Sequence, residues 1–257
     1  RNRHNLLRSQ DSLSVLRTMQ SVQYLQAFCL LPLLVDHHYI QQLPAIVESK
    51  DNTQERVAQA FMEFMQLGHI YESAMEVVKT YLGILDNEFN IKFQRNPIHN
   101  IESRLKSADS IMNKLIKKGI PFTIENARKY LLDIAGIRVT CCYINDIYVI
   151  AEMLSRRDDF VVLKQKDYIK NPKPSGYRSF HLVLNVPVHL SSSKTTVPVE
   201  IQIRTIAMDF WASLEHQLRY KPSGTITPEI SEELRLCAER IAETDIQMQK
   251  LYTEIME

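Results

Sequence analysis

Two acidic residues stand where predicted strands could bring them to one site. From residue 197 to 204, apolar residues alternate with Glu200, Gln202 and Arg204, so these three share one strand face. A carboxylate, an amide and a guanidinium in line suit a ligand that is both polar and anionic. Asp133, in the segment DIAGIR, precedes another predicted strand, where a carboxylate could bind Mg²⁺. The residues alone leave simpler interpretations open: an edge strand with one wetted face, and a cap between helix and strand.

The segment SRLKSADSIMNK has the composition of a phosphate site at the start of a helix. Unpaired N–H groups, the positive end of the helix dipole and nearby cations together attract phosphate. The alternative is a solvated basic face, which would include Lys117 and Lys118. Two cations precede the predicted helix, and a hydroxyl and a third cation lie in its first two turns: Arg104, Lys106, Ser110 and Lys114.

A loop rich in proline and glycine, NPKPSGYRSFH, carries an aromatic residue among cations. Tyr177 could stack on a nucleotide base in this loop, which also carries Lys173, with cation–π attraction from Arg178. The alternatives are an aromatic that packs the loop and, for His181, a structural hydrogen bond.

The charge distribution supports a local anion-binding site and argues against a uniformly basic surface. The net charge is +1, which disfavours binding to nucleic acid by bulk charge alone. Residues 104 to 178, however, hold 15 Lys+Arg against 8 Asp+Glu, and the remainder is acidic. The middle of the chain is therefore expected to meet anions.

The elements that would position these residues follow from the hydrophobic periodicity. Strand-like alternation covers residues 137–143, 160–163, 180–186 and 197–204, and a loop is expected around Pro97 and His99. Helical spacing covers 57–90, the segment after Ser107, 124–132, 147–154, 206–217 and the tail from 231. These patterns predict an α/β (α+β) domain: a mixed β-sheet of about five strands flanked by helices.

The domain of residues 56–228 is expected to carry two extensions. Residues 1–55 form an N-terminal extension, helical or partly disordered, whose apolar run at 22–35 is too short to cross a membrane. Residues 229–257 form a C-terminal helix with an apolar residue every seven positions from Leu234 to Ile255, which could pack on the domain or pair subunits. Four cysteines without CxxC spacing indicate reduced thiols and a cytoplasmic protein.

Four motifs, in order, resemble those of the synthetase domain of RelA/SpoT-type alarmone synthetases, and the stand-alone architecture resembles a small alarmone synthetase. The resemblance covers about residues 57 to 250, and its last motif is highly specific. The motifs are R-x-K-S…S-x-x-x-K, D-I-A-G-[IL]-R, K-x-S-G-Y-R-S-x-H and V-E-I-Q-I-R-T-x-A-M-x-F-W-A-x-x-E-H.

The resemblance implies a nucleotidyltransferase-like synthetase fold and transfer of the β,γ-pyrophosphate of ATP to the ribose 3′-oxygen of GDP or GTP. The products would be AMP and guanosine tetra- or pentaphosphate, the alarmones of the bacterial stringent response. It also implies a homotetramer, with no membrane partner.

By motif position, the resemblance gives each candidate residue a role. Arg104 and Arg138 would enclose the adenine. Asp133 would bind Mg²⁺, and Glu200 would lie beside the metal and orient or deprotonate the 3′-hydroxyl. The ATP phosphates would be held by Lys106, Ser110, Lys114 and Lys117. Tyr177 would stack on guanine, and the acceptor nucleotide would also contact Lys173, His181, Gln202 and Arg204.

Two other functions remain open on the sequence. One is a related enzyme, such as a pyrophosphokinase acting on the 3′ end of RNA. The other is a non-catalytic module that binds RNA or senses nucleotides. The presence of both Asp133 and Glu200 argues against the module, because anion binding alone does not favour carboxylates.

Overall fold

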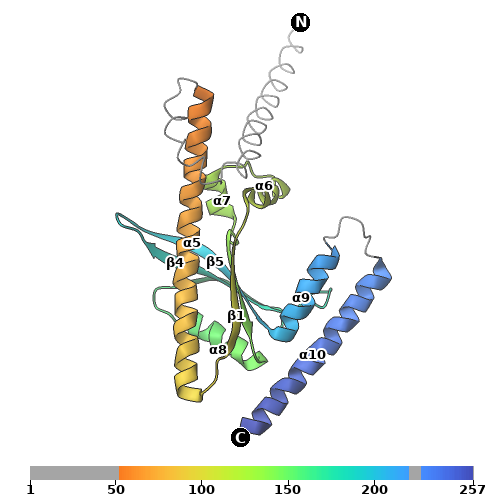
Figure 1. Ribbon diagram of the computed structural model, residues 1–257. Helices are drawn as coiled ribbons and strands as arrows, with labels where there is room; N and C mark the ends of the chain where they lie inside the picture. Colours follow the sequence, from red (N-terminus) through yellow and green to blue (C-terminus); the bar gives the residue numbers. More distant parts are fainter. Residues whose placement is uncertain (1–51, 220–226, 257) are drawn as a thin grey trace, which may run out of the picture. The chain divides into compact units, whose positions relative to one another are not determined.

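A computed structural model describes residues 52–219 and 227–256, which divide into two compact units. In the described part, the smaller unit comprises residues 52–69 and 107–131, and the larger comprises 70–106 together with the chain from 132 onward. Figure 1 shows the elements in chain order. They are α5 (Asn52–Phe93), β1 (Ile98–Leu105), α6 (Ala108–Lys117), α7 (Ile124–Tyr130), β2 (Ala135–Cys141), α8 (Ile144–Ser155), β3 (Val161–Asp167), β4 (Phe180–His189), β5 (Lys194–Thr205), α9 (Ile206–Arg219) and α10 (Pro228–Met256).

The larger unit is built on a five-stranded sheet with the order β1-β2-β5-β4-β3. β2 and β5 are parallel, and the other neighbouring pairs are antiparallel, so the sheet is mixed. The α+β class with a mixed sheet of about five strands flanked by helices is thereby confirmed.

One expected loop is a strand. Residues 98–105 were not predicted as a strand, because their apolar residues, Ile98, Ile101 and Leu105, do not alternate with polar ones. They form the edge strand β1, which pairs antiparallel with β2 from Ile98 opposite Cys141 to Leu105 opposite Ala135. Backbone pairing to a neighbouring strand has overridden a weak local pattern here.

The central strand β5 separates an apolar face from a polar face. Val199, Ile201 and Ile203 are fully buried on one face. Glu200, Gln202 and Arg204 lie on the other, as the alternation predicted. Because β2 pairs in register, Arg138 lies opposite Gln202 on this polar face.

Helix α8 covers the apolar face. It packs against β2, β4 and β5, and its Ile147, Ile150 and Leu154 are fully buried. Tyr148 of α8 meets Phe180 of β4 edge to face, with ring centroids 5.9 Å apart. The core that holds the sheet rigid is therefore on the side opposite the polar side chains.

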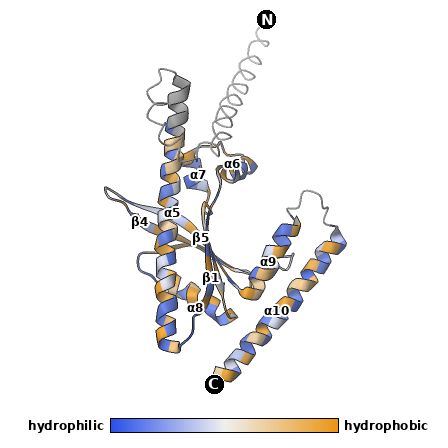
Figure 2. Cartoon of the chain, in the orientation of Figure 1, coloured by the Kyte–Doolittle hydropathy of each residue, from blue (hydrophilic) through white to orange (hydrophobic). Residues whose placement is uncertain are grey.

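Helices α9 and α10 pack side by side after β5, and both carry apolar and polar bands (Figures 1 and 2). The seven-residue repeat of the tail divides between two environments. Leu234 and Ile241 pack against Trp211 of α9, whereas Met248 and Ile255 are exposed. The first half of the repeat therefore packs on the domain.

The smaller unit contains two short capped helices. Ser107 caps α6 by accepting a hydrogen bond from the Ser110 N–H. Thr123 caps α7, which ends two residues earlier than expected. Residues 1–51, which include most of the predicted N-terminal extension, lie outside the described residues. No helix in the described ranges is long and apolar enough to cross a membrane.

Candidate active site

A cavity of about 310 Å³ opens on the polar face of the sheet, among β1, β2 and β5. Its lining is dominated by cations and carboxylates, with backbone at Gly136 and Ile137. Six of the side chains predicted for the site share this one cavity: Arg104, Lys106, Asp133, Arg138, Glu200 and Gln202.

Lys106 and Asp133 form an ion pair in this cavity, with each side chain about one-fifth exposed. Lys106 directly follows β1, and Asp133 lies two residues before β2. The Lys106 N–H also donates to the Ile134 carbonyl at 2.8 Å. Antiparallel pairing of β1 with β2 thus brings together two residues that lie 27 positions apart in the sequence.

Arg138 is held by two carboxylates that were given no role on the sequence. Its Nη1 donates to Oε2 of Glu102 at 3.2 Å, and its Nε lies 3.4 Å from Oδ1 of Asp209. Arg104 lies on the same face of the sheet, opposite Gly136, and is exposed. A ligand can therefore reach both guanidinium groups from the cavity.

Glu200 is three-quarters shielded and lies at the end of the cavity nearest β4. Gln202 donates to its Oε2 at 3.1 Å, and Nδ1 of His181 lies 3.6 Å from its Oε1. Burial raises the pKa of Glu200, but the contacts with His181 and Gln202 outweigh burial and hold the pKa below its ordinary value. The nearby Asp133 carboxylate acts in the same direction as burial. Glu200 is therefore ionised at neutral pH.

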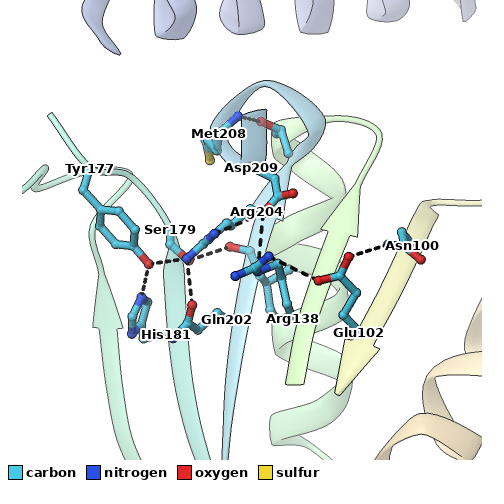
Figure 3. Close-up of polar contacts among 12 residues, drawn as sticks. Asn100, Glu102, Arg138, Tyr177, Ser179, His181, Gln202, Arg204, Met208 and Asp209 are labelled. Carbon is cyan, nitrogen blue, oxygen red and sulfur yellow. Dashed lines mark hydrogen bonds and ion pairs between the residues drawn. The ribbon is translucent and has the colours of Figure 1, made fainter. Parts of the chain in front are cut away.

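Hydrogen bonds link Arg204 to His181 through the Tyr177 hydroxyl (Figure 3). Arg204 can only donate, so the Tyr177 hydroxyl accepts from its Nη2 at 2.7 Å. The hydroxyl proton then faces Nε2 of His181 at 2.8 Å. This places the ring proton of a neutral His181 on Nδ1, the nitrogen that faces Glu200.

Arg204, the first donor in this series of hydrogen bonds, is buried. Its side chain is 5% exposed, and it donates to Asp209 at 3.1 Å and to Oε1 of Gln202 at 2.7 Å. The guanidinium thereby orients both Tyr177 and Gln202. The sequence placed Arg204 at the acceptor nucleotide, and the structure places it beneath the side chains that would touch that nucleotide.

The loop before β4 gathers aromatic and cationic side chains around Tyr177. Nζ of Lys173 lies 4.4 Å from the centre of the Tyr177 ring and 4.8 Å from that of Tyr168. Tyr168 also meets His181 edge to face, with centroids 5.1 Å apart. Tyr168 and Lys166 were not predicted from the sequence, although the run KDYIK next to the loop carries the same pattern of an aromatic residue among cations.

Three predicted phosphate ligands, Ser110, Lys114 and Lys117, lie on α6 in the smaller unit. The Ser110 hydroxyl accepts from that of Ser107 at 2.9 Å, which keeps both at the first turn. α6 begins at Ala108, so the helix start lies where the sequence predicted it.

Of the three carboxylates that line the cavity, Asp133 and Glu200 could hold a divalent cation, whereas Glu102 pairs with Arg138. Within 52–219 and 227–256 there is no cluster of three or more His, Cys, Asp and Glu residues that could hold a metal ion alone. Two oxygen donors on one cavity wall fit Mg²⁺, which commonly takes one or two carboxylates and completes its shell with water and phosphate oxygens.

The polar face of this mixed sheet joins cations, carboxylates and a basic aromatic loop, an arrangement that suits a polyphosphorylated ligand. Residues 103–225 match the family described as "Region found in RelA / SpoT proteins". The chain belongs to this RelA/SpoT family.

Its relatives include short proteins of similar architecture. The chain is 44% identical over 170 residues to the GTP pyrophosphokinase YwaC of Bacillus subtilis, covering 66% of this chain and 81% of the relative. It is 38% identical over 187 residues to the GTP pyrophosphokinase YjbM of the same organism, covering 73% and 87%. The crystal structure of small alarmone synthetase 1 from B. subtilis, bound to its product pppGpp, superposes with a TM-score of 0.69 at 37% identity, covering 76% of this chain and 98% of that one.

Proposed function

We propose that this protein is a (p)ppGpp synthetase, which transfers pyrophosphate from ATP to the 3′-hydroxyl of GDP or GTP and releases AMP. The observation that carries the proposal is the position of Glu200. This ionised carboxylate lies between a cavity lined by cations and the aromatic loop of Tyr177.

The two sides of Glu200 suit the two substrates. On the cavity side, Arg104 and Arg138 would enclose the adenine, and Lys106 would contact the phosphates. The family resemblance also assigns Ser110, Lys114 and Lys117 to the ATP phosphates. On the loop side, Tyr177 would stack on guanine, with Lys173 and His181 at the acceptor nucleotide. Gln202 and Arg204 would complete this side, Arg204 from beneath.

Pyrophosphoryl transfer requires little covalent participation by the protein. A phosphoryl group passes between oxygens with its charge spread over the non-bridging atoms, so cations and positioning do most of the work. The acceptor 3′-hydroxyl must lose its proton, and Glu200 is the carboxylate placed to accept it. Glu200 is held in place by two contacts, with His181 at Oε1 and with Gln202 at Oε2.

Mg²⁺ fits this site through Asp133 and Glu200. When bound, it would neutralise charge on the transferred phosphates. Asp133 is paired with Lys106, so binding of metal and ATP would let Lys106 exchange the carboxylate for a phosphate oxygen. That exchange keeps the charge of each group compensated.

The exposed apolar residues near the end of α10, Met248, Leu251 and Ile255, support association of subunits. The family resemblance implies a homotetramer. The cytoplasm is the expected compartment, since the cysteines offer no disulfide framework.

The test is transfer of labelled phosphate from γ-labelled ATP in the presence of Mg²⁺ and one acceptor at a time: GDP, GTP or RNA. The expected result is label on a guanosine tetra- or pentaphosphate, with AMP formed in equal amount. Label on RNA would replace the proposal with an RNA 3′-end pyrophosphokinase. No transfer to any acceptor would overturn catalysis and leave a nucleotide- or RNA-binding module.

A further inference from the structure

Residues 173–178, which include Lys173 and Tyr177, are called the acceptor loop below. Helix α10 contacts this loop directly, although the helix lies beyond the matched family region of residues 103–225. The contact is between Ala238 of α10 and Gly176, the residue before Tyr177. Gly176 has φ +87°, and a Cβ built on it would lie 2.5 Å from the Ala238 Cβ. The loop backbone at Gly176 therefore approaches α10 so closely that no side chain larger than that of glycine fits at this position.

A hydrogen bond fastens the same contact. Nη1 of Arg178 donates to the carbonyl of Ala238 at 3.3 Å and to that of Gly176 at 3.1 Å. The loop itself is a closed turn, because the Gly176 N–H donates to the Lys173 carbonyl at 2.8 Å and the Lys173 N–H to the Tyr177 carbonyl at 3.1 Å. A closed turn moves as a unit, so whatever displaces Gly176 also displaces Lys173 and Tyr177.

Apolar packing continues from this contact to the Tyr177 ring. Ala238 is buried in a cluster with Trp211 and Ala212 of α9, and Tyr177 packs against that cluster. The Trp211 indole N–H donates to the Leu234 carbonyl at 2.9 Å, which ties α9 to α10 at this level. One wall of the Tyr177 environment is therefore supplied by the C-terminal helix.

We infer that α10 sets the affinity for the acceptor nucleotide by positioning the loop of residues 173–178, and that Ala238 is the positioning residue. The inference rests on the proposed function, in which Tyr177 and Lys173 bind GDP or GTP. It gives α10 a role in the reaction besides any role in association of subunits.

The test is Ala238→Leu in the full chain. The larger side chain is expected to displace Gly176, because Ala238 is buried and its Cβ already leaves no room for a Cβ on Gly176. The expected result is a rise in acceptor KM of at least about fivefold, with the KM for ATP and kcat within twofold of wild type. Weaker binding of a fluorescent GDP analogue without ATP is expected in parallel. Cys237→Leu, at the exposed neighbouring position, is the matched control and should change none of these values.

A double-mutant cycle separates positioning from a general loss of structure. If Ala238 acts through Tyr177, Ala238→Leu should change the acceptor KM less than twofold in a Tyr177→Ala background. Equal effects in both backgrounds, or an unchanged acceptor KM in folded Ala238→Leu, would overturn the inference while wild-type synthesis still supported the proposed function. Absence of synthesis by the wild type would overturn the proposed function and the inference with it.

Ala238→Gly serves if Ala238→Leu does not fold. It removes the methyl group that meets Gly176 without adding bulk, so the loop loses its support and the acceptor KM should again rise. An unchanged acceptor KM in Ala238→Gly would also overturn the inference.

Discussion

The two ends of the polar sheet face hold their charged side chains in different ways. At the donor end, around β1 and β2, Arg138 pairs with Glu102, and the two side chains are 36% and 57% exposed. At the acceptor end, around β4 and β5, Arg204 is 5% exposed and supports Tyr177 and Gln202 through hydrogen bonds.

This difference indicates how each substrate would bind. The acceptor end is preorganised, so a nucleotide there meets side chains already in position. At the donor end the cations form ion pairs with neighbouring carboxylates. Under the proposed function, ATP would therefore replace the carboxylate partners of Lys106 and Arg138. The exposed Arg138–Glu102 pair can exchange partners at small cost, whereas the buried network around Arg204 cannot. The Lys106–Asp133 pair, about one-fifth exposed, is intermediate between the two.

The largest expected effect is at Glu200, where the two ends meet. Glu200→Gln should fold normally and lose at least about 10²-fold in kcat, because it removes the proton acceptor but keeps the side-chain shape. Steady-state synthesis of guanosine tetraphosphate measures the loss, and circular dichroism checks the fold. Turnover near wild type would remove the proposed role of Glu200.

The next effect concerns the preorganised end. Tyr177→Ala should weaken acceptor binding by about 1–3 kcal/mol, the value of one stacked base, with the KM for ATP unchanged. Tyr177→Phe keeps the ring and removes only the hydroxyl between Arg204 and His181. It should retain most acceptor affinity and lower kcat. If both variants lose affinity equally, the hydroxyl network and not the ring determines binding.

A smaller effect, in the opposite direction, is expected at the donor end. Glu102→Gln removes the charge that pairs with Arg138, so the KM for ATP should fall about two- to fivefold, the range for an exposed ion pair. Glu72→Gln, on the exposed side of α5, is the control and should have no effect. A higher KM for ATP in Glu102→Gln would show that Glu102 positions Arg138 for ATP.

The smallest effect tests the support beneath the acceptor end. Asp245 of α10 accepts from the Thr205 hydroxyl at 2.5 Å, and that hydroxyl accepts from the Met208 N–H at the start of α9. Burial raises the pKa of Asp245, only partly offset by the Thr205 hydrogen bond. A carboxyl whose pKa is raised on folding destabilises the protein as pH rises through its ordinary pKa.

Asp245→Asn should therefore melt at the same temperature as wild type or slightly higher at pH 7.5. The difference should shrink as pH falls toward about 4, where the wild-type carboxyl becomes protonated. Asp146→Asn is the contrasting variant, because Asp146 is 2% exposed and pairs with Arg95 at 2.6 Å. Thermal melts should show a clear loss for Asp146→Asn, and a similar loss for Asp245→Asn would contradict the sign argued here.

The strands with regular alternation were predictable, and β1 was not. In β5, Val199, Ile201 and Ile203 are buried, and Glu200, Gln202 and Arg204 lie on the opposite face, so periodicity alone gave the correct faces for these residues. β1 is an edge strand with a polar sequence, and only its pairing with β2 makes it a strand. Glu102, which β1 adds to the cavity, was for that reason absent from the prediction, whereas Arg104 of the same strand was predicted from its motif.

The chain itself, read as a sequence, determined the fold class, the polar face of β5 and the residues able to bind phosphate and metal. These follow from residue type and from spacing within one element, which are local properties. The tertiary structure decided which of them meet. It paired Lys106 with Asp133, buried Arg204 beneath Tyr177, and set Ala238 against Gly176. Such contacts join residues far apart in the chain and depend on strand order and helix packing, which no local pattern encodes.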